Sequence, residues 1–156
     1  MKVYTIQKRE FLTNVDAEGV ILPTRDVEYS IFSDDENTLW ALKWMEEQFC
    51  RRIDSPLDRE LIWLWPDSYH YLYEKEALDF GRYAFFTFEI PANYYKKAIL
   101  WSDFYRWHLV LNRLWENEPD ESDRYERIFQ LKRNEKPRTI QGITTRLHKE
   151  WVKKIT

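Results

Sequence analysis

The polar residues best able to take part in chemistry gather just after an apolar stretch near the middle of the chain. Ser102 and Asp103 stand where a helix is expected to begin, and His108 and Asn112 follow four residues apart. Residues at that spacing share one helix face, so they can hydrogen-bond each other or a ligand. Asp103 and His108 are therefore candidate catalytic residues. The alternative is structural: Ser102 caps the helix, Asp103 faces the helix dipole and His108 is half-buried and hydrogen-bonded.

Other common kinds of catalytic site lack their motifs. The three His have no His-Glu-x-x-His or paired-Cys spacing, so no metal site is expected. The three Gly are isolated and form no phosphate loop, and no Gly-x-Ser-x-Gly elbow is present. Cys50 falls inside a predicted helix, where a packed thiol is expected rather than a nucleophile.

Composition limits the class of protein. A chain of 156 residues is long enough for one domain with a sizeable core. The net charge of −3 does not favour a general nucleic-acid binder. The single Cys50 rules out an internal disulfide, and charges interrupt every apolar run. We therefore expect a cytoplasmic protein without membrane contact. The eight Trp either fill a core or line a ligand groove.

The segment that positions the candidate residues runs from residue 83 to residue 115. A β-branched and aromatic run over 83–90 predicts a strand that Pro91 stops. A short strand is expected over 98–101, and a helix over 102–115. The sequence predicts a compact unit of strands and one helix.

The remaining elements are expected around this unit. Alternation predicts a strand over 2–7, and from Lys8 the pattern is helical, with Gly19 at the position of a C-terminal cap. Ser33 and Glu36 have capping-box spacing, which predicts a helix over 34–53. Its expected core stripe is Leu39, Leu42, Met45 or Glu46, Phe49 and Ile53. A buried strand is predicted over 61–65, and the Tyr-rich stretch 67–82 is expected to be irregular.

The basic C-terminal segment allows two structures. Its apolar residues recur every fourth position, which suits an amphipathic helix, but its β-branched pieces also suit strands. The residues in question are Ile143, Leu147, Trp151 and Ile155. The whole chain is therefore predicted to be a single α+β domain over 1–156, with a central, mostly antiparallel sheet and helices packed against it.

Several of these pieces together resemble a small bacterial family that is defined only as a domain of unknown function. They are the opening Tyr4-Thr5-Ile6-Gln7, then Ile62-Trp63-Leu64-Trp65, Phe88-Glu89-Ile90-Pro91 and Leu100-Trp101-Ser102-Asp103-Phe104 with Trp107-His108. The likeness covers most of the chain. It implies no activity.

The opening strand, followed by a helical pattern ending in Gly-Val, is also similar to the start of ADP-ribosyltransferase-like domains. The resemblance implies NAD as a cofactor, with Tyr4, Thr5 and Gln7 positioning the dinucleotide and Trp63 or Trp65 stacking on a base or on nicotinamide. Thr5 stands where such domains carry His or Arg. Their late catalytic Glu has no counterpart, because Gln141 is neutral. Both an active and a degenerate version fit this pattern.

Three functions therefore remain open. The first is an NAD- or nucleotide-cleft protein in which Asp103 or His108 orients the acceptor and no metal is used. The second is a non-catalytic module that binds a protein partner, for example in bacterial or phage defence. The third is RNA binding through the basic C-terminal segment and exposed aromatic residues.

Overall fold

The computed structural model describes residues 1–23, 36–53, 59–69, 75–76, 78–113 and 121–156. Its strands pair antiparallel throughout, with helices packed beside them, which confirms the predicted α+β class. The predicted capping residue Ser33 and the predicted helix end at Trp115 lie outside the described residues.

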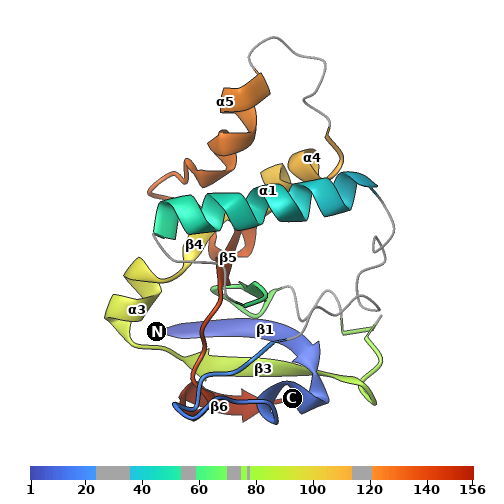
Figure 1. Ribbon diagram of the computed structural model, residues 1–156, viewed down its shortest axis with the longest axis vertical. Coiled ribbons are helices and arrows are strands. Elements are labelled where there is room, and N and C mark those ends of the chain that lie inside the picture. Colours follow the sequence, from blue (N-terminus) through green and yellow to red (C-terminus); the bar gives the residue numbers. More distant parts are fainter. Residues whose placement is uncertain (24–35, 54–58, 70–74, 77, 114–120) are drawn as a thin grey trace.

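The strands form two three-stranded sheets rather than one central sheet (Figure 1). The lower sheet has the order β1 (Lys2–Lys8), β3 (Tyr83–Glu89), β6 (Val152–Ile155). The upper sheet has the order β2 (Ile62–Leu64), β5 (Ile140–Thr144), β4 (Leu100–Asp103). An isolated antiparallel bridge between Tyr4 and Trp65 links β1 to the end of β2. All four segments predicted as strands thus contain strands.

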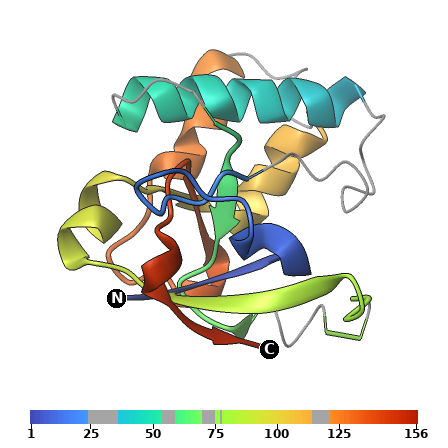
Figure 2. The same ribbon diagram turned by 60° about the horizontal axis from the view of Figure 1, so that its bottom comes forward.

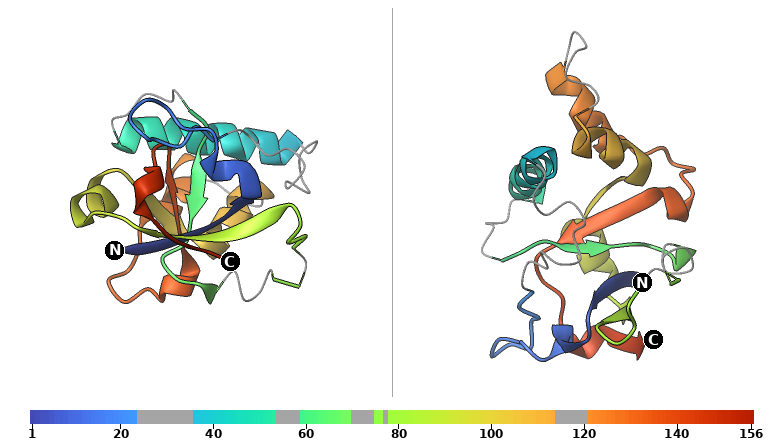
Figure 3. Two further views of the ribbon diagram at one scale, coloured as in Figure 1. Left: turned by 90° about the horizontal axis from the view of Figure 1, so that it is seen from below. Right: turned by 90° about the vertical axis from the view of Figure 1, so that its right-hand side faces the viewer.

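The helices lie mainly on one side of the upper sheet, as Figures 1 and 3 show. They are α1 (Glu36–Ile53), α4 (Phe104–Leu111) and α5 (Glu121–Glu126), while α3 (Ala92–Lys97) flanks the sheets. Sequence reasoning missed α3, because Pro91 was interpreted only as the end of a strand. Proline also suits the start of a helix, and here it is the N-cap residue.

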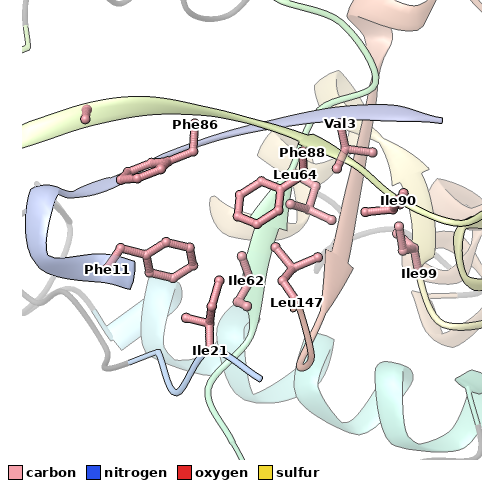
Figure 4. Packing of buried hydrophobic residues seen from close by; sticks show 11 residues of the cluster. Val3, Phe11, Ile21, Ile62, Leu64, Phe86, Phe88, Ile90, Ile99 and Leu147 are labelled. Carbon is pink, nitrogen blue, oxygen red and sulfur yellow. The ribbon is translucent and has the colours of Figure 1, made fainter. Parts of the chain in front are cut away.

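The two sheets enclose the largest group of buried residues, here called the interior cluster (Figure 4). Both sheets and the segment after β1 contribute to it. Its members include Val3, Phe11, Ile21, Ile62, Leu64, Phe86, Phe88, Ile99 and Leu147. Burial of so many large apolar side chains is the main force that holds the two sheets together.

A second group of residues, here called the helix-side cluster, fills the space between the upper sheet and the helices. Its members include Ala41, Met45, Phe49, Leu100, Trp107, Val110, Tyr125, Ile128 and Ile143. The buried stripe of α1 is Thr38, Ala41, Met45, Gln48 and Phe49, so Leu39, at 46% exposure, does not belong to the core as predicted. Met45 and Phe49 are buried as predicted, while Thr38 and Ala41 take the places predicted for Leu39 and Leu42, because small and uncharged polar side chains can also be buried.

The predicted helix after Lys8 shortens to a single 3-10 turn at Arg9–Leu12. Asp16 explains the early end, since its Oδ1 accepts from the backbone N–H groups of Glu18 and Val20, both at 2.9 Å. Gly19, with φ of 79°, closes this turn instead of capping a helix.

The C-terminal segment takes the strand alternative, as β5 and β6 joined through a 3-10 turn at Lys149–Trp151. None of the described helices has both the length and the apolar composition needed to cross a membrane.

Candidate functional site

The residues predicted to hold NAD meet where β1 crosses the end of β2. Tyr4 and Trp65 exchange both backbone hydrogen bonds, at 2.9 and 2.8 Å. The buried Thr5 Oγ1 donates to the Trp63 carbonyl oxygen at 2.8 Å, and Gln7 Nε2 donates to Thr5 Oγ1 at 3.0 Å. The Thr5 hydroxyl can donate one hydrogen bond, and it donates that bond to the backbone. These polar groups tie the two sheets together.

The two predicted stacking residues, Trp63 and Trp65, pack in different places. The Trp63 ring lies against Trp107 of α4, with centroids 5.3 Å apart and planes tilted by 34°. Trp65 instead joins a small cluster on the outer face of the lower sheet, with Ile6, Tyr83, Phe85, Tyr4 and Leu78. The Tyr4 ring in this outer cluster stacks on Phe85 at 5.4 Å. The two indoles therefore do not form a single aromatic clamp.

Asp103 serves as the N-cap of α4, a role that the sequence assigned to Ser102. Its Oδ1 accepts from the Arg106 backbone N–H at 2.8 Å, while Ser102 is buried inside β4. An N-cap carboxylate satisfies one of the orphan N–H groups of the first turn and suits the positive end of the helix dipole.

His108 lies at the surface of α4 and is held by its own helix. Its Nδ1 lies 2.8 Å from the Phe104 carbonyl oxygen, and its ring meets the Phe104 ring edge-on. Asn112 does not reach the imidazole; its Nδ2 donates to the His108 backbone carbonyl at 2.7 Å. The side-chain pair suggested by the sequence is replaced by two bonds to the backbone.

The candidate residues therefore fall into two groups. Tyr4, Thr5, Gln7, Trp63 and Trp65 adjoin one another at the junction of β1 and β2. Asp103 and His108 are bonded within α4, whose Trp107 contacts Trp63 at the junction.

Gln141 is a buried polar residue to which the sequence, because its side chain is neutral, assigned no role. It lies on β5 opposite Ser102 of β4, and the two side chains are only 3% and 2% exposed. Its Nε2 has no hydrogen-bond partner among the described residues. A buried amide without a partner costs roughly 1–3 kcal/mol, and such groups often mark positions kept for reasons other than stability. A polar side chain within the apolar run Ile140–Thr144 was its only signal in the sequence.

Two further polar arrangements involve other parts of the molecule. Asp16 Oδ2 and the Arg59 guanidinium form an ion pair of 2.7 Å, and the hydrogen bond from Arg59 holds the pKa of Asp16 below its usual value. Burial raises the pKa of Tyr94, whose hydroxyl hydrogen-bonds Thr144 Oγ1 at 2.9 Å and the Arg146 carbonyl oxygen. Both arrangements join distant segments of the chain.

One further feature of the described residues has the form of a site. A shallow, open hollow on α1 is lined by Lys43, Glu46, Glu47, Cys50 and Arg51. Within the described part of the chain, His, Cys, Asp and Glu form no group of three or more able to hold a metal ion. Comparison with protein-family models, with curated proteins and with solved structures finds no match to this chain.

Proposed function

We propose that this protein is a non-catalytic protein-interaction module. The observation that carries this proposal is that the groups best placed for chemistry are bonded within the fold. The Asp103 carboxylate caps α4, the His108 ring is bonded to the preceding turn, and the Thr5 hydroxyl donates to β2. A substrate would have to displace these bonds, and losing an N-cap costs about 1 kcal/mol.

Exposed apolar side chains support the same proposal. Leu39 on α1, Tyr105 on α4 and Ile155 on β6 are between 46% and 55% exposed. Large exposed side chains, tyrosine above all, are common at protein interfaces.

Site-specific photo-crosslinking tests the proposal. A benzophenone amino acid would replace Leu39, Tyr105 or Ile155 in the native cells, with Lys96 on α3 as the exposed control position. We expect one crosslinked protein from at least one test position, and a complex of defined stoichiometry from the two purified proteins. Identical crosslinks from Lys96, or no complex from the purified proteins, would contradict the proposal.

An NAD-cleft function is the second candidate, because the five predicted cofactor residues adjoin one another at the junction. A ligand that binds only the folded protein raises the melting temperature by mass action. Thermal shifts with NAD, ADP-ribose, ATP and nicotinamide are the test, using Gln7→Ala and Trp65→Ala, with the exposed Gln130→Ala as control. The interaction module predicts no saturable shift. A saturable shift that only Gln7→Ala and Trp65→Ala abolish would put the NAD function first.

A further inference from the structure

The strand β6 forms an open edge of the lower sheet. It pairs with β3 on one side only, and no described strand lies beyond it. Figure 2 shows β6 at the margin of the molecule, below β3. Lys153, Lys154 and Ile155 are all exposed. Exposed edges offer unpaired backbone groups to another chain.

The hydrogen-bond pattern shows which backbone groups face outward. Phe85 and Thr156 exchange both N–H to O=C bonds, each at 2.9 Å. In an antiparallel pair the next residue along the strand belongs to a non-hydrogen-bonded pair, and Ile155 is that residue, opposite Phe86. The N–H and C=O of Ile155 therefore point away from β3, toward the position of an added strand.

Alternation along β6 gives this edge two chemically different faces. Thr87 opposes Lys154 and Phe88 opposes Val152, so Lys153 is the extra residue of a bulge between them. Thr87 also pairs with Tyr4, whose ring belongs to the outer cluster. Lys154, opposite Thr87, therefore lies on the outer face of the lower sheet. Ile155 lies opposite Phe86, which belongs to the interior cluster. The edge thus presents two cations and one apolar side chain.

We propose that β6 takes up an extended segment of a partner protein as an added strand, and that acidic and apolar residues alternate in this segment. The proposal rests on the proposed function and names its partner class. Opposite charges across a strand pair stabilise it, and like charges destabilise it. A second copy of this chain pairing through β6 would bring two edges that each carry Lys153 and Lys154 close together, so charge favours an acidic partner.

The opposing explanation is that the lysines and the bulge protect the edge. Short edge strands, lysines and bulges are the usual means by which proteins prevent unwanted strand pairing. Protection predicts that neither an acidic nor a basic strand docks, whereas a docking edge predicts that the acidic strand binds selectively.

Two synthetic peptides separate these explanations, one alternating Glu with Val and one alternating Lys with Val. Backbone amide shifts of the isotope-labelled full chain would be followed by NMR during titration. We expect saturable shifts centred on Lys153, Lys154 and Ile155 with the acidic peptide only. Equal shifts with both peptides, shifts centred elsewhere, or none would overturn the proposal.

Two variants test the geometry. Ile155→Pro removes the outward N–H without removing a bond to β3, so we expect the acidic peptide to bind at least about tenfold more weakly. The double change Lys153→Glu and Lys154→Glu should exchange the preference, so that the basic peptide binds instead. Lys96→Glu with Lys97→Glu on α3 changes the net charge equally, and we expect it to leave peptide binding unchanged.

The outcomes keep the two proposals apart. If the acidic peptide does not bind the original chain and the basic peptide does not bind the Lys153→Glu and Lys154→Glu variant, β6 is a protected edge. Failure of the basic peptide alone would overturn the choice of partner by charge. Neither conclusion depends on Ile155→Pro, so a loss of stability in that variant leaves both unchanged. If a crosslinked partner binds the Lys153→Glu and Lys154→Glu variant as tightly as it binds the original chain, the proposal of an interaction module is retained, but β6 is not its docking site. If no test position gives a crosslink and neither peptide binds, both proposals are wrong.

Discussion

The two sheets of this protein differ in how their faces are covered. The upper sheet is packed on both sides, with Ile62 in the interior cluster and Ile143 in the helix-side cluster. The lower sheet shares the interior cluster, but among the described residues its other face carries the small outer cluster around Phe85, and β6 forms an edge with no described strand beyond it. The residues first considered for catalysis belong to the doubly covered side. Their polar groups form part of that side of the fold, while in the less covered sheet the backbone groups of Ile155 face outward.

A substitution in the interior cluster, which both sheets share, should have the largest effect. Phe86 is fully buried on β3, and its ring lies 5.6 Å from that of Phe11. Phe86→Ala should lower the free energy of unfolding by about 3–5 kcal/mol. Because both sheets share the cluster, far-UV circular dichroism and tryptophan fluorescence should report one coincident transition. Two separate transitions would mean that the sheets fold as independent units.

The upper sheet should respond sharply to added volume at Gly142. A Cβ there would lie 2.7 Å from Ile99 Cγ2 and 2.7 Å from Trp101 Cζ3. We expect Gly142→Ala to cost about 1–3 kcal/mol by urea denaturation, because neither the side chains nor the central strand can move freely. Gly81→Ala is the control, since its nearest atom is an Asp79 side-chain oxygen at 3.0 Å. Equal losses in both variants would contradict tight packing at Gly142.

Two substitutions at Asp103 distinguish a structural role of this residue from a catalytic one. Asp103→Ala should destabilise the protein by about 0.5–2 kcal/mol through loss of the cap, and Asp103→Asn should be nearly neutral, because Asn caps helices as well as Asp does. Partner binding should survive Asp103→Asn. An activity that Asp103→Asn abolishes at unchanged melting temperature would restore the catalytic assignment.

The smallest effect concerns the pair Asp16–Arg59. The pKa of Asp16 in the folded protein is lowered below its ordinary value of 3.8. The pair with Arg59 therefore stabilises the protein fully when the pH is above 3.8, and this stabilisation is lost as the pH falls through the lowered pKa. Asp16→Asn should therefore melt at a lower temperature than the original chain at pH near neutrality, and the gap should narrow in acid. Glu18→Gln is the neighbouring control. A gap that stays constant with pH would show that the turn, rather than the charge, is what Asp16 supplies.

Local patterns predicted the elements of this fold better than their assembly. The alternating and aromatic runs identified β1, β2 and β3, and the helix predicted over 34–53 is close to α1. Spacing by four in the C-terminal segment could not distinguish a helix from strands. The contacts that decide it, such as Gly142 beneath Trp101, join residues far apart in the sequence.

The candidate site was less predictable, for a related reason. Sequence indicates which side chains can hydrogen-bond, but not which partner comes first. Backbone groups bind the side chains of Thr5, Asp103 and His108, and the partner of Thr5 lies 58 residues away. Gln141 is buried on β5 because of strand pairing between distant segments, which its neighbours in the sequence do not reveal. The open edge of β6 could not be inferred without the pairing order of the strands.

The contact between Trp63 and Trp107 also gives the molecule an optical property. Two indoles 5.3 Å apart and inclined by 34° are close enough for their electronic transitions to couple. Coupled indoles produce a pair of circular dichroism bands of opposite sign. Trp40 and Trp44 form a second stacked indole pair at 6.5 Å, so the contribution of Trp63 and Trp107 is the part of the signal that is lost when either of these two rings is replaced. Since one ring belongs to the upper sheet and the other to α4, this contribution reports when that helix lies against the sheet. The protein therefore contains its own spectroscopic reporter at the point where its two groups of candidate residues meet.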